Sequence, residues 1–147
     1  MKVSSRVEYG LIALTDIVIH GENGETVSAP EIAERENISH KYLEQILLML
    51  RQAGFITAQK GIRGGYSLAC SQEKVSLSDV LNALDSNILA DVDDGRRDET
   101  GLYGAVNDCL WDKINESLNR YSGSLKLSDF ANQCRSKITS KWDMYVI

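Results

Sequence analysis

The chain has 147 residues, of which 43% are hydrophobic and 25% charged, a globular composition that argues against a disordered or fibrous protein. No apolar run approaches the roughly 20 residues that span a bilayer, and no secretory signal pattern opens the chain, so we expect a cytoplasmic protein without a membrane partner. The three cysteines, Cys70, Cys109 and Cys134, lie far apart and are odd in number. This excludes a secreted disulfide framework and predicts reduced thiols.

The net charge of −5 argues at first against a nucleic-acid partner, because such proteins usually present a basic face. The segment 39–66 reverses this balance with a local charge of +3, which leaves −8 for the rest of the chain. Its cations are Lys41, Arg51, Lys60 and Arg63, and its one acidic residue is Glu44. We expect any polyanion to bind at this segment.

Capping signals predict the first two helices. Ser5 and Glu8 have the spacing of a capping box, in which the serine hydroxyl and the carboxylate each satisfy a free backbone N–H. They predict a first helix over 5–20. Ser28 and Glu31 repeat the box and predict a short second helix that ends near residue 37.

A third helix is predicted after a brief turn, with Ser39 as its N-cap and Gly54 as a left-handed stop. Its apolar stripe consists of Leu43, Ile46, Leu47 and Leu50. The pattern then becomes extended, and residues 55–59 and 66–70 flank the glycine-rich segment 60–65, which predicts a β-hairpin with a long tip.

The predicted fold class is therefore mostly α with a small β-hairpin. Three helices, the last two joined by a tight turn, followed by a two-stranded ribbon are typical of a winged helix-turn-helix. A small α+β domain without a ligand stays the alternative.

The second half of the chain predicts a sensor region and a dimerisation helix. Residues 76–84 form a short helix, the acidic stretch 85–101 is a mobile surface loop, and residues 102–122 form an amphipathic helix ended by Gly123. The apolar face of this helix consists of Val106, Leu110, Trp111, Ile114, Leu118 and Tyr121. We expect the same helix of a second copy to cover this face in a two-fold homodimer, with packing on the first helix as the alternative.

These predictions divide the chain into three parts. Residues 1–84 form a winged helix-turn-helix DNA-binding domain, residues 85–101 a sensor-region loop, and residues 102–147 the dimerisation helix and a C-terminal tail.

A helix-turn-helix places its second helix in the major groove of DNA. The candidate contacts on this helix are Ser39, His40, Lys41, Tyr42, Glu44 and Gln45. Lys41 suits a phosphate or guanine, Gln45 suits adenine, and Glu44 suits the amino group of cytosine, while the helix N-terminus favours a phosphate. A solvated helix face is the alternative for each residue.

The predicted hairpin tip adds further candidate DNA contacts. Lys60 and Arg63 can extend toward phosphates or into a narrow minor groove, and Gly64 allows close backbone approach. Catalysis finds no support, because neither His20 nor His40 stands at a recognisable motif spacing from a nucleophile. The sequence also lacks a P-loop, a His-Glu-x-x-His and a Cys-x-x-Cys, so we expect neither an enzyme nor a metal site.

The segments 38–45, 50–54 and 60–69 resemble the Rrf2 (Rrf-two) family of bacterial regulators, and the pair Tyr-Leu-Glu-Gln at 42–45 with Gly-Gly-Tyr at 64–66 is specific. The resemblance extends over the whole chain. It implies a homodimer joined through the long helix that binds a two-fold symmetric operator in double-stranded DNA. It also implies Ser39, Lys41, Glu44 and Gln45 as major-groove contacts and Lys60 as the wing contact.

Family members that bind an iron–sulfur cluster carry three cysteines before the long helix, whereas residues 85–101 contain none. Thiolates hold such clusters and aspartates substitute poorly, so we expect a cluster-free repressor without a cofactor. Two alternatives stay open: a cluster that uses Glu8, Cys109 and other ligands, and a winged-helix protein-interaction module without specific DNA binding. The predicted effector is a metabolite, a partner protein or oxidation of Cys109 beside the dimer seam.

Overall fold

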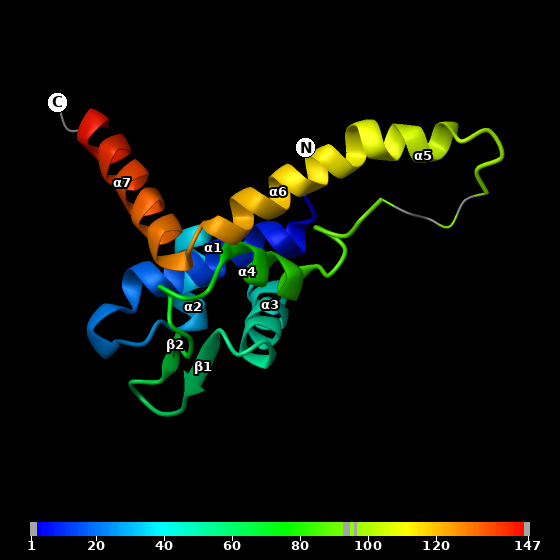
Figure 1. Cartoon of the computed structure of the whole chain (residues 1–147). Coiled ribbons are helices and arrows are strands. Elements are labelled where there is room, and N and C mark those ends of the chain that lie inside the picture. Colours follow the sequence, from blue (N-terminus) through cyan, green and yellow to red (C-terminus); the bar gives the residue numbers. More distant parts are fainter. Residues whose placement is uncertain (1–2, 93–94, 96, 146–147) are drawn as a thin grey trace.

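The computed structural model describes residues 3–92, 95 and 97–145 (Figure 1). Its elements are α1 (Ser5–His20), η1 (Glu22–Gly24), α2 (Ala29–Glu36), α3 (His40–Gln52), β1 (Ile56–Gln59), β2 (Gly65–Leu68), α4 (Leu77–Leu84), α5 (Leu102–Val106), η2 (Asn107–Trp111), α6 (Asp112–Ser124) and α7 (Leu127–Tyr145). The predicted fold class, mostly helical with one small antiparallel hairpin, is confirmed. No helix among the described residues has the length and apolar character needed to cross a membrane.

Serine side chains cap several of these helices, as predicted. The hydroxyl of Ser39 accepts the N–H of the third residue of α3 at 3.3 Å. At the start of α2 both bonds of the capping box form, since Ser28 N donates to the Glu31 carboxylate at 2.7 Å and its hydroxyl accepts the Glu31 N–H at 3.3 Å. These bonds satisfy backbone donors that have no partner inside the helix.

The predicted capping box at Ser5 and Glu8 is wrong by one residue. Ser4 has the extended backbone of an N-cap, and its hydroxyl accepts the Val7 N–H at 3.3 Å. The third helical position therefore belongs to buried Val7, which carries no carboxylate, and Glu8 lies outside the box. Two adjacent serines are equally good caps, so the residue types alone do not separate Ser4 from Ser5.

The hairpin is fastened to the helical body by a third extended segment. β1 pairs antiparallel with β2, with Ile56 opposite Leu68 and Gln59 opposite Gly65. Val27, between η1 and α2, exchanges two backbone hydrogen bonds with Tyr66, at 2.9 and 2.7 Å. The wing thus has a fixed position beside the helix-turn-helix.

One hydrophobic core joins the first four helices and α7. Gly10 permits the closest approach within it, because a Cβ at this position would lie 2.4 Å from Leu84 Cδ2 of α4. Leu127 and Ala131 of α7 are 0% and 1% exposed and belong to the same core. The stretch after residue 126, predicted as a tail, is therefore a 19-residue helix with its first turns buried on the body.

Residues 102–124 form an almost continuous rod, α5–η2–α6, that projects away from the body, with a π-helical turn at Asn107–Trp111 (Figure 1). The prediction that Gly123 ends this helix is wrong, because the helix continues to Ser124. It ends where Leu125 pairs with the start of α4: Leu77 N donates to Leu125 O at 2.9 Å. A tertiary contact rather than glycine sets this end.

The described residues leave the apolar face of the rod largely open to solvent. Its six large side chains are between 36% and 66% exposed: Val106, Leu110, Trp111, Ile114, Leu118 and Tyr121. The alternative in which this face packs on the first helix is therefore wrong, because the rod instead leaves the body beyond α4.

Asparagines of the rod hold the first part of the sensor-region loop, among them Asn119, which donates to the carbonyl of Leu89 at 3.5 Å. Asn107 donates to the carbonyl of Val92 at 3.0 Å, and Asn115 donates to the carboxylate of Asp91 at 3.0 Å. Farther along the loop, Asp98 accepts the N–H of Gly104 at 2.8 Å in the first turn of α5. Residues 93, 94 and 96 of the predicted loop, and 146 and 147 of the predicted tail, lie outside the described residues.

Candidate nucleic-acid interface

α3 buries one face and presents the other. Its buried side chains are at most 1% exposed and anchor the helix in the core: Leu43, Ile46, Leu47 and Leu50. His40, Lys41, Glu44 and Gln45 are exposed. Because residues three and four apart share a helix face, these four predicted contacts form one polar surface.

Two exposed residues of this surface also face each other. His40 Nδ1 lies 3.3 Å from Glu44 Oε1, and the side chains are 54% and 61% exposed. Protonation of the imidazole would make this contact an ion pair. A base or phosphate approaching Glu44 or His40 therefore competes with the partner on the next turn.

Tyr42 differs from the other predicted helix contacts. It is half-buried, and its ring packs edge-on against Tyr9 of α1, with ring centroids 5.8 Å apart and an interplanar angle of 82°. This contact holds α3 against α1. Its structural place is thus between two helices rather than among the exposed residues of the polar surface.

The prediction missed Leu48 as a candidate contact. Leu48 is 51% exposed and stands seven residues after Lys41, so it extends the same face by one turn. Apolar side chains at such positions can contact the methyl group of thymine. The signal was present in the sequence, because Leu48 falls outside the predicted apolar stripe.

The wing presents its cations at a tight turn. Lys60 and Arg63 are exposed, and Gly64 N donates to Gly61 O at 2.9 Å, which closes a β-turn over residues 61–64. A Cβ on Gly64 would lie 2.5 Å from the Gln59 carbonyl oxygen, so this position requires glycine. Both predicted wing cations are thereby brought to the open end of the hairpin.

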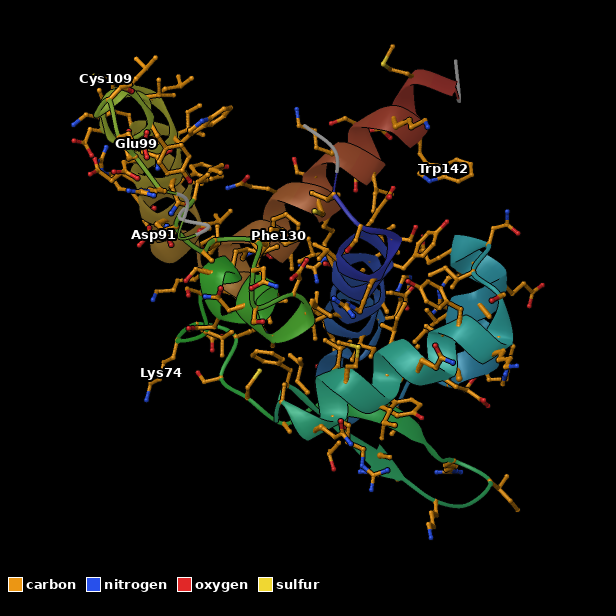
Figure 2. All side chains as sticks on the ribbon, turned by 90° about the vertical axis from the view of Figure 1, so that its right-hand side faces the viewer. Lys74, Asp91, Glu99, Cys109, Phe130 and Trp142 are labelled. Atoms are coloured by element: carbon orange, nitrogen blue, oxygen red, sulfur yellow. The ribbon has the colours of Figure 1, made fainter. Side chains whose placement is uncertain are left out.

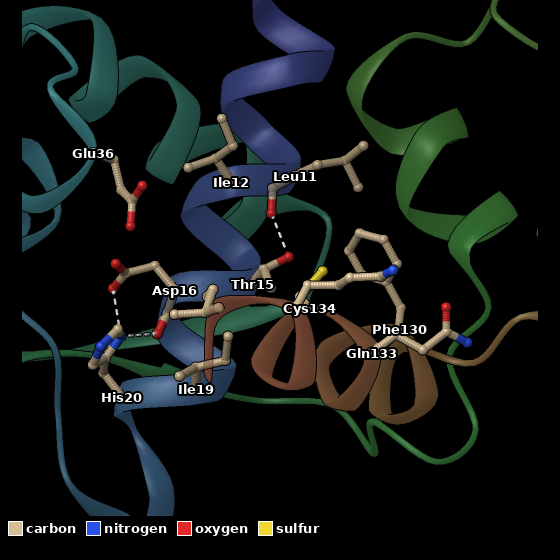
Figure 3. Close-up of a pocket in the computed structure, with 12 residues that line it drawn as sticks. Leu11, Ile12, Thr15, Asp16, Ile19, His20, Glu36, Phe130, Gln133 and Cys134 are labelled. Carbon is tan, nitrogen blue, oxygen red and sulfur yellow. Dashed lines mark hydrogen bonds and ion pairs between the residues drawn. The ribbon is translucent and has the colours of Figure 1, made fainter. Parts of the chain in front are cut away.

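A groove of about 480 Å³ runs between α1 and α7 (Figure 3). It is lined by Leu11, Ile12, Thr15, Asp16, Ile19, His20, Glu36, Phe130, Gln133, Cys134, Lys137 and Ile138. One end is polar: the carboxylate of Asp16, whose side chain is 1% exposed, receives two hydrogen bonds from Arg35 of α2, at 2.8 and 3.0 Å. The remaining walls are largely apolar.

The titratable groups at the polar end influence one another. Partial burial, followed by the carboxylate of Asp16, raises the pKa of Glu36. The hydrogen bonds to Asp16 raise the pKa of the Arg35 guanidinium, which therefore stays charged. His20 Nδ1 lies 3.4 Å from the same Asp16 carboxylate. Asp16 thus joins α1 to the first helix of the helix-turn-helix.

The three thiols lie in separate places. Cys109 is exposed on η2 at the distal part of the rod, remote from Phe130 in the body (Figure 2). Cys70 follows β2 and Cys134 lines the groove, and burial raises the pKa of both thiols. Cys109 is therefore the thiol most open to solvent.

Comparison with known proteins gives the same architecture. A family model described as Rrf2, iron-dependent transcriptional regulator, matches residues 3–133. The HTH-type transcriptional regulator IscR of Cereibacter sphaeroides is 31% identical over 134 residues, 88% of this chain and 86% of that protein. The solved structure of CymR (YrzC), the global cysteine regulator of B. subtilis, matches with a TM-score of 0.76 at 26% identity, over 90% of this chain and 98% of that one. IscR of T. potens matches with a TM-score of 0.71 at 28% identity, over 91% and 88%.

Because the description of this family names iron, the donor atoms decide whether an iron–sulfur cluster fits this chain. Such clusters are held mainly by several cysteine thiolates. Residues 85–101 contain no cysteine, and the three thiols of the chain do not converge. Within the part of the chain that the structure describes, no group of three or more His, Cys, Asp or Glu side chains is arranged to hold a metal ion. The residues do not fit a cluster.

The family match covers most of the chain, and the relatives named above are transcriptional regulators rather than enzymes. The solved structures of CymR and of T. potens IscR match this fold over 90% and 91% of the chain. This chain belongs to the Rrf2 family of winged-helix transcriptional regulators.

Proposed function

We propose that this chain is a homodimeric repressor that binds a two-fold symmetric operator in double-stranded DNA and carries no iron–sulfur cluster. In this proposal α3 lies in the major groove and the hairpin reaches the adjacent minor groove. Ser39, Lys41, Glu44 and Gln45 contact phosphates and base edges, and Lys60, Arg63 and Gly64 form the wing contact. The single observation that carries the proposal is the exposed polar face of α3 beside the cationic turn of the wing.

The charge of the protein sharpens this proposal. A chain of net charge −5 is repelled by a duplex at long range, so its binding energy must come from the local cations of segment 39–66. Each phosphate that a lysine or arginine neutralises contributes about 0.9 to the slope of log affinity against log salt concentration. We therefore expect steep salt dependence from an acidic protein.

The apolar face of the rod supports the homodimer. Ile114 at 43%, Leu110 at 46% and Trp111 at 43% exposure form a contiguous stripe that no other part of the described chain covers. In a two-fold pair the same stripe of each copy covers that of the other. The pair then presents two copies of α3, which must lie about 34 Å apart to read successive turns of one groove.

In this proposal the bound dimer represses transcription by occluding a promoter. An effector releases the dimer from DNA by binding another dimer geometry more tightly. Two features support different effectors. Cys109 is exposed on the rod and is open to oxidation. The groove between α1 and α7 is large enough for a small metabolite, and its polar end touches the link between α1 and α2.

The test measures binding by fluorescence anisotropy on duplexes that the protein itself selects from a randomised pool, at several salt concentrations. The variants are Lys41→Ala, Lys60→Ala and their combination, with Lys74→Ala as the matched control because this exposed lysine lies outside α3 and the hairpin (Figure 2). Because each substitution removes two lysines from the dimer, we expect each interface variant to reduce the salt slope by about 1.8 and the combination by about 3.6, with Lys74→Ala unchanged.

Selection that yields no preferred sequence, or binding without a salt slope, contradicts the proposal. Under the protein-interaction alternative, the chain instead captures a protein partner that competitor DNA does not displace. Affinity at one salt concentration does not separate these cases, so the slope is the deciding quantity.

A further inference from the structure

The apex of the wing is an isoleucine. Ile62 and Arg63 are the two central residues of the turn that Gly64 N and Gly61 O close at 2.9 Å. Ile62 has a relative exposure of 107%, more than any other large hydrophobic residue described, and it is flanked by exposed Lys60 and Arg63. An apolar side chain that stays in water contributes no hydrophobic stabilisation, and burying this one requires the surface of a partner.

The turn that carries Ile62 contacts the segment that precedes α2. Thr26, before α2, donates its hydroxyl to the carbonyl of Arg63 at 2.9 Å, although the two residues are 37 positions apart. Gly65 lies so close to the backbone that an added Cβ would stand 2.8 Å from the Val27 carbonyl oxygen. The apex is therefore attached to the body on one side. This attachment reduces the conformational entropy that the turn would lose on binding a partner.

The neighbouring charges identify the partner of this apolar tip. Two cations beside one aliphatic side chain suit a surface that is anionic at its rims and apolar between them. The minor groove of DNA has this character, with phosphates on both edges and sugar carbons on its walls, and a narrow groove concentrates negative potential. Aliphatic wedges that enter this groove partly unstack a base step and bend the duplex.

We propose that Ile62 is an apolar wedge that enters the minor groove while Lys60 and Arg63 hold the phosphates on its rims. Thr26 acts as a positioning residue for this turn. The inference rests on the proposed function, which already places the wing at DNA, and adds that the wing selects sites that bend easily. The favoured steps are pyrimidine–purine steps at the position of the wing, since these are the easiest to kink.

The experiment uses the full chain and duplexes that it selects from a randomised pool, carrying a donor and an acceptor dye at their ends. Anisotropy gives affinity and salt slope, and energy transfer between the dyes reports bending. The variants are Ile62→Ala, Ile62→Ser and the conservative Ile62→Leu. Val92→Ala is the matched control, because Val92 is 47% exposed and lies outside the helix-turn-helix and the wing.

We expect Ile62→Ala and Ile62→Ser to lose affinity about tenfold and to straighten the duplex, with the salt slope unchanged because no charge is removed. Ile62→Leu retains both affinity and bending. Thr26→Val, which lacks the hydroxyl donor, shows a smaller loss of the same kind. Val92→Ala behaves as the wild type.

The wedge is overturned if Ile62→Ala and Ile62→Ser bind and bend DNA like the wild type while Lys60→Ala still lowers the salt slope. A change in salt slope in Ile62→Ala also overturns it, because the loss would then be electrostatic. If the wild type shows no salt-dependent binding at all, the proposed function fails instead, so the two failures are distinguishable.

Discussion

The carboxylate of Glu36 lowers the folding stability of the protein when it is ionised. Its pKa is raised by partial burial and by the carboxylate of Asp16, so the folded state binds its proton more tightly than the unfolded chain. Ionised Glu36 therefore costs stability above its folded-state pKa. This cost disappears as the pH falls through that value.

We expect Glu36→Gln to raise the midpoint of thermal unfolding at pH 7. The gain should shrink at acid pH, as the pH falls through the raised folded-state pKa of Glu36 and the wild-type carboxyl becomes neutral. Circular dichroism melts at both pH values measure this difference. Glu34→Gln, on the same helix but not in the groove, is the control. An equal gain at both pH values would show that charge is not the cause.

Cys109 is the residue at which oxidation can act without unfolding the body, because it is exposed on the rod. Under the thiol alternative, mild peroxide lowers DNA affinity of the wild type and leaves Cys109→Ser unaffected, since serine cannot form a sulfenic acid or disulfide. Anisotropy before and after treatment, with mass spectrometry of the thiols, checks this. If Cys109→Ser still loses DNA binding after peroxide while Cys134→Ser keeps it, the redox-sensitive thiol is Cys134 in the groove.

At the scale of elements, α1 and α2 are coupled by the ion pair between Asp16 and Arg35. The Asp16 side chain is 1% exposed, and Arg35 provides two hydrogen bonds to it. Removing the cation leaves a buried carboxylate without its main partner, a costly state in a protein interior.

We expect Arg35→Ala to lower the free energy of unfolding by about 3 kcal/mol. The double variant Asp16→Asn with Arg35→Ala should lose less, because no unpaired charge is then buried. Urea denaturation measures both values. Equal losses in the single and double variants would mean that the ion pair contributes little.

Local signals were enough to predict the helix-turn-helix and the hairpin. Ser28, Ser39 and Ser76 are caps whose partners lie within three residues, and the stripe of α3 is periodic. Prediction failed where long-range contacts decide. Helix α6 passes through Gly123 until Leu125 pairs with α4, and α7 forms because Leu127 enters a core built mostly by residues far away in the sequence.

The residues of the candidate site likewise include some that local sequence patterns predict and some that only long-range contacts position. Spacing alone identified Lys41 and Gln45 as residues of one exposed face, because α3 is anchored by a regular apolar stripe. The half-burial of Tyr42 depends on Tyr9 in another helix, and the rigid apex of the wing depends on Thr26. Neither contact has a local sequence signal.

For the whole molecule, the proposed dimer depends on the rod. If its apolar stripe joins two copies, Ile114→Asp places a charge in that seam and should give monomers. We expect affinity for a two-fold duplex to fall by at least a factor of 100, because binding by two joined modules is lost. Light scattering and anisotropy measure the two effects, with Glu116→Ala, an exposed residue of α6 outside the stripe, as control. A monomeric variant with unchanged affinity would contradict the two-fold operator.

The division at residues 84 and 101 stays a prediction, and the position of α7 bears on it. Leu127 and Ala131 pack into the core that contains Leu14 of α1 and Leu47 of α3. Synthesis of the first 84 residues alone therefore leaves this core open, and α7 has to follow before it can close. A fragment that stops before Leu127 would lack the closed core, although it can still carry the apolar face of the rod.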